Sequence, residues 1–252
     1  MKVSIITVCY NSENTIEHSI NSVLAQDYPH IEYIIIDGNS RDNTKSIIDK
    51  YKDKIARFVS EKDEGIYDAM NKGISMATGD VIGILNSDDF YKDNTVISKV
   101  VNLFVVQNPN AVYGDLVYVA KENTQKIVRY WKAGEYKEGM FLQGWMPPHP
   151  AFFVKRNIYQ EYGGFNTQLK SAADYELMLR FIHKEKIKVS YLPEVLIKMR
   201  AGGESNVSLV NRIRANQEDH LAWKLNGLKP GKLTLLLKPL SKIKQFFQIY
   251  KN

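Results

Sequence analysis

Short apolar runs alternate with amphipathic stretches over residues 1–95, and this alternation constrains the fold more than any other feature of the sequence. The apolar runs are rich in β-branched residues and are predicted to be strands: residues 3–10, 31–37, 56–61 and 80–86. The stretches between them carry apolar residues at helical spacing: residues 15–26, 43–54 and 65–78. Strands connected through helices predict a mostly parallel central sheet flanked by helices.

The pattern becomes mixed beyond residue 95. A helix is predicted at 96–107, and the runs 111–120 and 126–131 alternate like antiparallel strands. Loop, strand, short helix and turn follow over 144–166, then a helix at 174–185 and a strand that ends near residue 200. We therefore predict one α/β domain over residues 1–205, with a nucleotide-binding half (1–95) and an acceptor-side half (96–205), followed by a helical basic extension (206–252).

The charge of the chain is concentrated in its C-terminal segment. Residues 228–252 hold six lysines and no acidic residue, which equals the net charge of +6 of the whole chain. From Pro239 onward apolar residues recur at near-helical spacing beside these lysines. Two interpretations stay open: a basic amphipathic helix on an anionic membrane surface, or a helix packed on the body with solvated lysines. Because the lysines sit in a tail and not on a patterned face, we expect no nucleic-acid partner.

Several features indicate a cytoplasmic protein. A single cysteine, Cys9, excludes an internal disulfide framework and fits a reducing compartment. The N-terminal residues lack the cleavage pattern of a secretory signal. No stretch reaches the roughly 18 apolar residues of a membrane span. Together with the basic tail, we expect a protein that is peripheral at the inner face of the cell membrane.

Polar residues directly follow three of the predicted strands. They are Tyr10–Asn11, Asp37–Gly38–Asn39 and Asp88–Asp89. Ligands of parallel α/β sheets bind at the carboxyl ends of the strands, so these residues are expected along one rim. Asp88 and Asp89 repel each other unless a cation lies beside them, although Asn, Ser and Asp at a strand end also form turns.

The sequence lacks the glycine-rich loops that usually cradle phosphates. The position after the first strand reads NSENTI, without the Gly-x-Gly-x-x-Gly pattern of dinucleotide binding, and no Gly-x-x-x-x-Gly-Lys-Ser/Thr loop is present. A phosphate ligand would then need a divalent cation, Mn²⁺ or Mg²⁺, held by carboxylates.

Four segments, in order, resemble the family 2 glycosyltransferases of the GT-A fold: VSIITVCYN, EYIIIDGNSRDNT, EKDEGIYDAMNKGISMATGDVIGILNSDDFY and ADYELMLR. The resemblance covers roughly residues 1–205. It implies the GT-A fold of nucleotide-diphospho-sugar transferases. It also implies the activity of bacterial enzymes that add sugars to surface polysaccharides and glycolipids.

The resemblance assigns donor-binding roles to five residues of the first half. The ring of Tyr10 would lie against uracil, and the backbone near Thr7 would help to hold the base. Asp37 would accept a hydrogen bond from the base, although an Asx turn is its structural alternative. Asp63 would lie near the nucleoside and Lys72 near the diphosphate, where a lysine on the helix surface is the simpler interpretation.

The resemblance also implies a metal site and a closing loop. Ser87-Asp88-Asp89 stands where the family has its Asp-x-Asp type motif. Asp89 would bind Mn²⁺ or Mg²⁺, and Asp88 would contact the ribose or donor sugar and the metal's water shell. Arg200, in the segment RAGGES, would belong to a loop that closes over the donor.

Asp174 stands at the family's general-base position. The usual Glu-Asp pair reads Ala173-Asp174 here, which keeps the base and removes a neighbouring acid. The spacing Ser171-x-x-Asp174 also matches a helix capping box, a purely structural alternative. On the acceptor side the resemblance points to Trp145 and His149.

We therefore expect a metal-dependent inverting transferase that moves a hexose or N-acetylhexosamine from a UDP-sugar to a lipid-linked saccharide acceptor in surface polysaccharide synthesis. The alternative is a non-catalytic sugar-nucleotide-binding subunit, which Ala173 favours and Asp174 disfavours. A nucleotidyltransferase would need a Gly-rich basic loop after the first strand, and the sequence lacks one.

Overall fold

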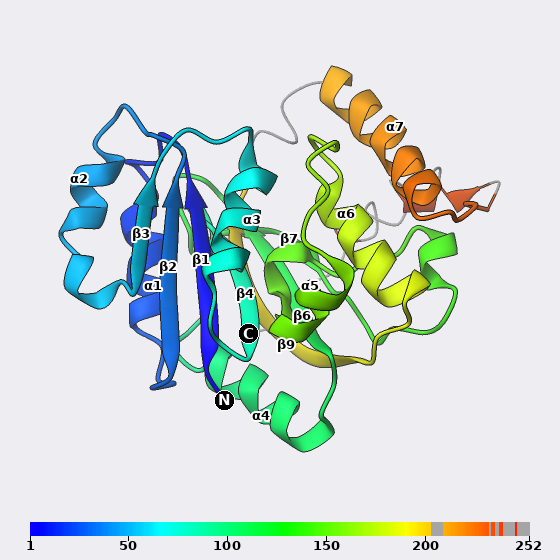
Figure 1. Ribbon diagram of the computed structural model, residues 1–252, viewed down its shortest axis with the longest axis horizontal. Coiled ribbons are helices and arrows are strands. Elements are labelled where there is room, and N and C mark those ends of the chain that lie inside the picture. The colour runs from blue at the N-terminus through cyan, green and yellow to red at the C-terminus, as the bar shows by residue number, and fades with distance from the viewer. Residues whose placement is uncertain (203–208, 232, 235–236, 239–244, 246–252) are drawn as a thin grey trace.

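The predicted alternation of strands and helices is present in the computed structural model, which describes residues 1–202, 209–231, 233–234, 237–238 and 245 (Figure 1). The strands of the first half are β1 (Val3–Cys9), β2 (Ile31–Asp37), β3 (Arg57–Ser60) and β4 (Val81–Asn86). Between them lie α1 (Ile16–Leu24), α2 (Thr44–Asp49), the short η1 (Lys52–Lys54) and α3 (Ile66–Met76). All four strands are parallel, as the βαβ pattern predicts.

The second half adds short strands and helices to the same sheet. Its strands are β5 (Phe90–Tyr91), β6 (Ala111–Val119), β7 (Ile127–Trp131), β8 (Phe152–Lys155) and β9 (Val189–Arg200). Its helical elements are α4 (Val96–Gln107), η2 (Met140–Gln143), η3 (His149–Ala151), α5 (Arg156–Tyr162), α6 (Ala173–Met178), the π-helical η4 (Leu179–Lys184) and α7 (Leu209–Leu225).

The sheet is parallel on one side and mixed on the other. Its strand order is β3-β2-β1-β4-β8-β6-β9-β5, and β7 pairs with β6 beside β8. β6 and β7 are antiparallel, as their alternating sequences predict. β9 returns parallel to β6 and then carries β5 on its outer edge. The long strand β9 thereby connects the Asp88–Asp89 turn to the acceptor-side half.

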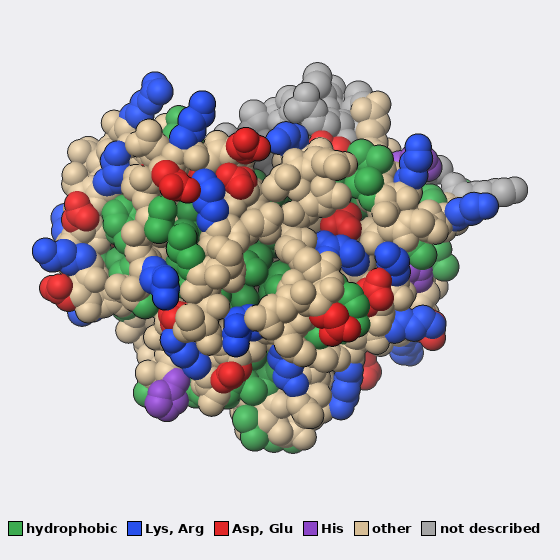
Figure 2. Space-filling model, in the orientation of Figure 1, with side chains coloured by type: hydrophobic (Ala, Val, Ile, Leu, Met, Phe, Trp, Pro, Cys, Tyr) green, Lys and Arg blue, Asp and Glu red, His purple; other side chains and the backbone are tan. Residues whose placement is uncertain are grey.

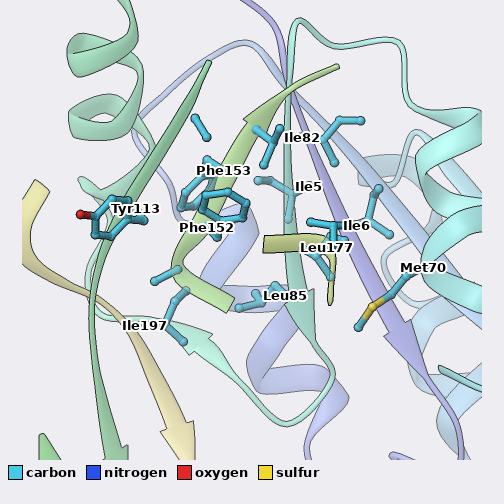
Figure 3. Close-up of a cluster of buried hydrophobic side chains, with 14 of the residues drawn as sticks. Ile5, Ile6, Met70, Ile82, Leu85, Tyr113, Phe152, Phe153, Leu177 and Ile197 are labelled. Atoms are coloured by element: carbon cyan, nitrogen blue, oxygen red, sulfur yellow. The ribbon is translucent and has the colours of Figure 1, made fainter. Parts of the chain in front are cut away.

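Helix α3 packs directly on the parallel strands, and Figure 1 shows it in front of the sheet. A Cβ atom at Gly73 would lie 2.4 Å from Cγ2 of Ile6, so only glycine lets the helix approach β1 this closely. Side chains of β1, β4, β8 and α3 meet in the core, among them Ile5, Leu85, Phe153 and Met70 (Figure 3). This packing fixes the strand tips relative to α3.

A buried carboxylate joins the opposite ends of these strands. Glu32 accepts hydrogen bonds from Nζ of Lys2 (2.7 Å), Oγ of Ser4 (2.6 Å) and both the amide (2.8 Å) and hydroxyl (2.6 Å) of Thr78. Burial alone would raise the pKa of Glu32, but these bonds outweigh it and lower the pKa from 4.5 to about 2. Glu32 is therefore an ionised structural residue.

The described part of the C-terminal segment packs on the body. The Thr234 hydroxyl donates to the carbonyl of Leu142 (2.6 Å), and Nζ of Lys238 lies 2.6 Å from Asp219 with both side chains nearly buried. Gln245 is 7% exposed. These contacts favour the interpretation in which the basic tail packs on the body. Apart from Gln245, the helix predicted from Pro239 onward lies outside the described residues. None of the described helices is both long and apolar enough to cross a membrane.

Candidate active site at the strand tips

The three polar strand ends meet on one rim, as the sequence predicts. Cys9, Asp37 and Asn86 end neighbouring strands, with Cys9 in register with Asp37 and Val8 with Asn86. Side-chain hydrogen bonds join the segments that follow: the amide of Asn11 donates to Oγ of Ser40 (2.8 Å). The hydroxyls of Ser12 and Ser87 lie 2.8 Å apart. The rim is therefore one connected surface.

Asp89 lies at the centre of this rim with a buried oxygen that lacks a partner. Its side chain is fully buried; Oδ2 accepts a 3.3 Å hydrogen bond from Asn86, whereas Oδ1 of Asp89 and Oδ1 of Asn86 have no hydrogen-bond partner among the described residues. Burial, and next the charge of Asp88, raises the pKa of Asp89 well above its usual value. A buried oxygen left in this state is costly unless a ligand completes it.

A divalent cation fits these oxygens. Carboxylate and amide oxygens are hard donors of the kind that Mg²⁺ and Mn²⁺ prefer. Within the described ranges no three His, Cys, Asp or Glu residues gather into a metal-binding cluster. A cation at Asp89 would therefore take its remaining ligands from Asp88, from water and from the phosphates of a bound nucleotide.

Arg200 is tied to the aspartate turn. Its Nη1 donates to the carbonyl of Asp88 (2.5 Å), and its Nη2 lies 2.6 Å from Nδ1 of His18. The ring of Phe90 packs against both residues: it stacks on the His18 ring at 4.0 Å, and the guanidinium of Arg200 lies 5.0 Å from its centroid. Burial, then the charge of Arg200, lowers the pKa of His18, which suits a neutral acceptor. His18 had no predicted role, because only the folded sheet places α1 beside the end of β9.

Tyr10 and Asp63 lie close together beside Gly38. Tyr10 is 59% exposed. A Cβ atom at Gly38 would lie 3.1 Å from Oδ2 of Asp63 and 3.5 Å from Cδ2 of Tyr10, so only glycine lets both side chains approach this closely. The ring and the carboxylate predicted to contact a nucleoside therefore lie beside each other.

Lys72 is held by three carboxylates beside Tyr10 and Gly38. Its Nζ lies 2.5 Å from Asp63, 2.9 Å from Glu61 and 3.3 Å from Asp68. Figure 2 shows acidic and basic side chains gathered above the tips of β3 and α3. Lys72 was predicted near the diphosphate; in the structure its contacts orient Asp63. The hydrogen bonds that Lys72 donates to Asp63 and then to Glu61 raise the pKa of Lys72.

Two other predicted donor residues are buried. Asp37 is fully buried and accepts hydrogen bonds from the amide and hydroxyl of Ser40 and from the hydroxyl of Ser60 (2.6 Å). Asp37 thus closes a local turn onto Ser40, three residues on, and a contact of Asp37 with a base would require it to give up some of these bonds. Thr7 lies inside β1, fully buried and paired with Ile35 and Leu85. A contact of the backbone near Thr7 with a base stays a prediction.

Asp174 joins two residues from distant parts of the chain. Its Oδ2 lies 3.1 Å from Nδ1 of His149, and its Oδ1 accepts a 3.2 Å hydrogen bond from the hydroxyl of Tyr67. The side chains of His149 and Asp174 are 31% and 17% exposed, so both remain reachable from solvent. Burial, then the charge of Asp174, raises the pKa of Tyr67, which therefore stays protonated and donates. Tyr67 was not predicted, since 107 residues separate it from Asp174.

The capping-box interpretation of Asp174 is wrong. Helix α6 begins after Ala172, and no side chain caps it from that position. The amides of Ser171 and Ala172 instead donate to Oε2 of Glu218 on α7, at 2.7 and 3.1 Å. Glu218 thus performs the capping that the local spacing assigned to Ser171 and Asp174, and the Asp174 carboxylate is left to face His149 and Tyr67.

Tyr118 of β6 relates the two carboxylate positions to each other. Burial raises the pKa of Tyr118, Arg129 opposes this effect, and the charges of Asp89 and Asp174 add to it. Both carboxylates therefore lie near the same tyrosine.

Trp145 packs among aromatic side chains of the segment between β7 and η3. Its Nε1 donates to the carbonyl of Ala133 (2.7 Å), and its ring packs against Tyr136 at 5.2 Å and Phe141 at 5.5 Å. The contacts fix the loop between β7 and η3. A direct contact of Trp145 with an acceptor stays a prediction.

Comparisons with known proteins agree with this geometry. An uncharacterised glycosyltransferase of Mycobacterium tuberculosis (strain CDC 1551 / Oshkosh) is 31% identical over 180 residues, which cover 71% of this chain and 68% of the relative. A PGL/p-HBAD biosynthesis glycosyltransferase of Mycobacterium bovis BCG is 24% identical over 208 residues, 81% of this chain and 78% of that protein.

Solved structures of similar shape show the same fold. TarS 1–349 of S. aureus in complex with UDP-GlcNAc superposes with a TM-score of 0.68 at 18% identity, covering 90% of this chain and 65% of TarS 1–349. The mannosyltransferase PcManGT of Pyrobaculum calidifontis, in complex with GDP-Man and Mn²⁺, has a TM-score of 0.66 at 20% identity, covering 94% and 68%. These neighbours have the GT-A fold, and this chain shares it.

The profile of glycosyl transferase family 2 matches residues 4–163, which is more than half of the chain and includes every strand of the parallel half. Together with the relative at 31% identity, this match shows that the chain belongs to glycosyl transferase family 2.

Proposed function

We propose that the protein transfers a hexose or N-acetylhexosamine from a UDP-sugar to a saccharide acceptor, with inversion at the anomeric carbon and with Mn²⁺ or Mg²⁺ as cofactor. The observation that carries this proposal is the buried Oδ1 of Asp89 at the strand tips, which has no hydrogen-bond partner among the described residues. A sugar nucleotide needs a charge-neutralising group for its diphosphate and a base for the acceptor. Asp89, through a bound cation, would serve the diphosphate, and Asp174 would serve as the base.

The nucleoside would bind at Tyr10 and Asp63. The exposed ring of Tyr10 offers a flat apolar surface to a base. Lys72 contacts Oδ1 of Asp63, while Oδ2 lies beside Gly38. One facing oxygen suits uracil, which presents a single ring N–H, better than guanine, which presents two adjacent donors. This favours UDP over GDP.

Asp89 and Asp88 would hold the cation. When bound, it stabilises the negative charge that develops on the departing diphosphate. Arg200 fixes the backbone of Asp88 from the other side, so the two carboxylates keep their positions while the charge on the ligand changes.

Asp174 would accept the proton of the acceptor hydroxyl as the new glycosidic bond forms. Tyr67 and His149 each bind one of its oxygens, which fixes the plane of the carboxylate. This orientation gives Asp174 a role in turnover that a subunit without catalysis would not need. The arrangement therefore favours an enzyme over the binding-subunit alternative.

The acceptor is proposed to be lipid-linked, with the protein held at the membrane surface by its basic tail. The support for this proposal is the cluster of lysines in residues 228–252. Lys238 is paired with Asp219 and would not take part.

A donor screen tests the proposed function. Purified protein is incubated with UDP- and GDP-sugars in the presence of Mn²⁺, with and without lipid-linked saccharides, and nucleotide release is measured. We expect release of UDP from a UDP-sugar by the wild-type protein. This release should be lost in Asp89→Asn and kept in the control variant Asp53→Asn, which changes an exposed turn. Binding of UDP and Mn²⁺ without release from any donor would establish the binding-subunit alternative instead.

A further inference from the structure

The segment between α5 and α6 determines where Asp174 lies. Residues 163–172 connect the two helices, and Asp174 belongs to the first turn of α6. The position of its carboxylate therefore depends on the contacts that hold this segment. Two side chains of α3, Tyr67 and Asn71, supply such contacts; they are four residues apart, so they lie on one face of the helix.

Asn71 binds the backbone of Phe165 in both directions. Its Nδ2 donates to the carbonyl oxygen of Phe165 (2.8 Å), and its Oδ1 accepts a hydrogen bond from the amide of the same residue (2.8 Å). A side-chain amide that uses both its donor and its acceptor on one residue fixes that residue as a neighbouring strand would. Gly164 permits this approach, because a Cβ atom at this position would overlap Oδ1 of Asn71.

Tyr67 joins Phe165 to Asp174. The rings of Tyr67 and Phe165 are stacked, with centroids 5.5 Å apart and planes inclined by 22°. The hydroxyl of Tyr67 donates to Oδ1 of Asp174 (3.2 Å). Because this hydroxyl lies at the end of a rigid ring, it meets its acceptor with good geometry only when the ring keeps its orientation. The ring of Phe165 provides the surface that fixes this orientation.

The same helix also holds the residues proposed to bind the nucleoside. Lys72 follows Asn71 directly, and its Nζ lies 2.5 Å from Asp63, which precedes the N-cap residue of α3, Gly65, by two positions. The close packing at Gly73 fixes α3 on the sheet. Adjacent residues of one helix thus hold the proposed nucleoside contact and the segment that carries the proposed base.

We propose that Asn71 is a positioning residue for Asp174. It fixes the backbone of Phe165, the ring of Phe165 orients Tyr67, and the hydroxyl of Tyr67 orients the carboxylate. The inference rests on the proposed function and deepens it, because it identifies how α3 places the base. A residue that acts in this way changes turnover without changing the affinity for the donor.

Asn71→Ala tests the separation of turnover from binding. The change removes both hydrogen bonds to Phe165 and is expected to lower kcat about two- to tenfold, the value of the Tyr67 hydrogen bond through which Asn71 acts. The donor KM and the UDP affinity measured by calorimetry should stay unchanged, because Lys72 and Asp63 are intact. An unchanged kcat would overturn the proposal, and so would a loss of UDP affinity as large as the loss of kcat.

Double variants show whether Asn71 acts through Tyr67 and Asp174. Residues that act as one unit give losses that do not multiply. Adding Asn71→Ala to Tyr67→Phe should therefore leave kcat close to that of the lower single variant. Adding Asn71→Ala to Asp174→Asn should leave the residual kcat unchanged. Losses that multiply in both double variants would indicate an independent structural role and would contradict the proposal.

Gly164→Ala disturbs the same contact while Asn71 stays in place. The backbone of Gly164 is outside the left-handed region, and the nearest atoms that a new methyl group would meet belong to Asn71. The kcat of this variant should fall as in Asn71→Ala. In both variants the amide of Phe165 should exchange its hydrogen faster than in wild type, measured by hydrogen exchange over residues 163–172. Unchanged exchange in both would show that Asn71 does not hold this segment.

Asn110→Ala is the matched control. Oδ1 of Asn110 accepts a hydrogen bond from the amide of Lys188 (2.9 Å) beside the first residues of β6 and β9, at the end of these strands remote from Asp88. This variant should lower Tm and keep wild-type kcat; a loss of kcat equal to that of Asn71→Ala would overturn the proposal. If wild type releases nucleotide and Asn71→Ala matches it, this inference fails while the proposed function stands. If wild type releases nucleotide from no donor, the proposed function fails and this inference fails with it.

Discussion

Replacement of Asp174 by Asn distinguishes the catalytic account of this residue from a structural one. The amide keeps an oxygen that can accept the hydrogen bond from Tyr67 and is nearly isosteric with the carboxylate. It cannot accept a proton from an acceptor hydroxyl. General-base groups contribute about 10²–10⁴-fold to turnover, so kcat is expected to fall by that amount.

The stability cost of this change should be small. Asp174 loses its charged contact with His149, and both side chains are partly exposed, so the cost is about 1 kcal/mol or less. For a chain of this size that corresponds to a shift in Tm of about 2–4 °C. The residue does not cap helix α6, so helix stability is not at stake.

Glu218→Ala is the matched comparison. It removes the acceptor of the two amides at the start of α6 and is expected to cost about 0.5–2 kcal/mol, the usual value of a lost helix cap. Nucleotide release at saturating donor and thermal melting are measured for both variants. Asp174→Asn should lose turnover with little change in Tm, and Glu218→Ala should show the reverse. Wild-type turnover in Asp174→Asn with a clearly lowered Tm would refute the assignment.

Three further predictions follow from individual contacts. Tyr67→Phe removes the hydrogen bond to Asp174 and should lower kcat about two- to tenfold, while the UDP affinity measured by calorimetry stays unchanged. An unchanged kcat would show that Tyr67 does not contribute to turnover. Glu32→Gln should destabilise the protein by up to about 3 kcal/mol at neutral pH. The lowered pKa of Glu32 stabilises the fold above pH 4.5, and this stabilisation is lost as the pH falls towards 2. If the free energy of urea unfolding depended on pH equally in wild type and variant between pH 2 and 4.5, the prediction would be wrong. Gly73→Ala should lower the free energy of unfolding by about 1–3 kcal/mol despite the higher helix propensity of Ala, because the new Cβ would overlap Ile6. A higher free energy of unfolding in urea would show that the close contact is absent.

The parallel half of the fold could be predicted because its signals are local. Continuous β-branched runs, helical periodicity and polar residues at strand ends each depend on neighbours within a few positions. The parallel order then brings Asn11, Ser40 and Ser87 to one rim without further information.

The rest of the site depends on contacts that no local pattern records. Tyr67 reaches Asp174 only because the fold brings the first turns of α3 and α6 together. The Ser-x-x-Asp spacing at residue 171 favoured a cap, but α7 supplies Glu218 and displaces that arrangement. Asp37 has the sequence of an exposed turn, yet Ser60 from the neighbouring strand β3 closes over it.

The same limit applies to the second half of the chain. The alternating sequences of β6 and β7 predicted their antiparallel pairing, whereas the parallel return of β9 beside β6 joins residues about eighty positions apart. That pairing places Arg200 at the aspartate turn. The relation of donor and acceptor sides is thus a property of the folded sheet.

Anomalous diffraction from crystals soaked with UDP and Mn²⁺ is the most direct measurement of the central claim. The account predicts one manganese peak within coordination distance of the Asp89 carboxylate, bridged to the diphosphate, with the uracil ring between Tyr10 and Asp63. A manganese peak away from Asp89, or a nucleotide bound away from the strand tips, would contradict it.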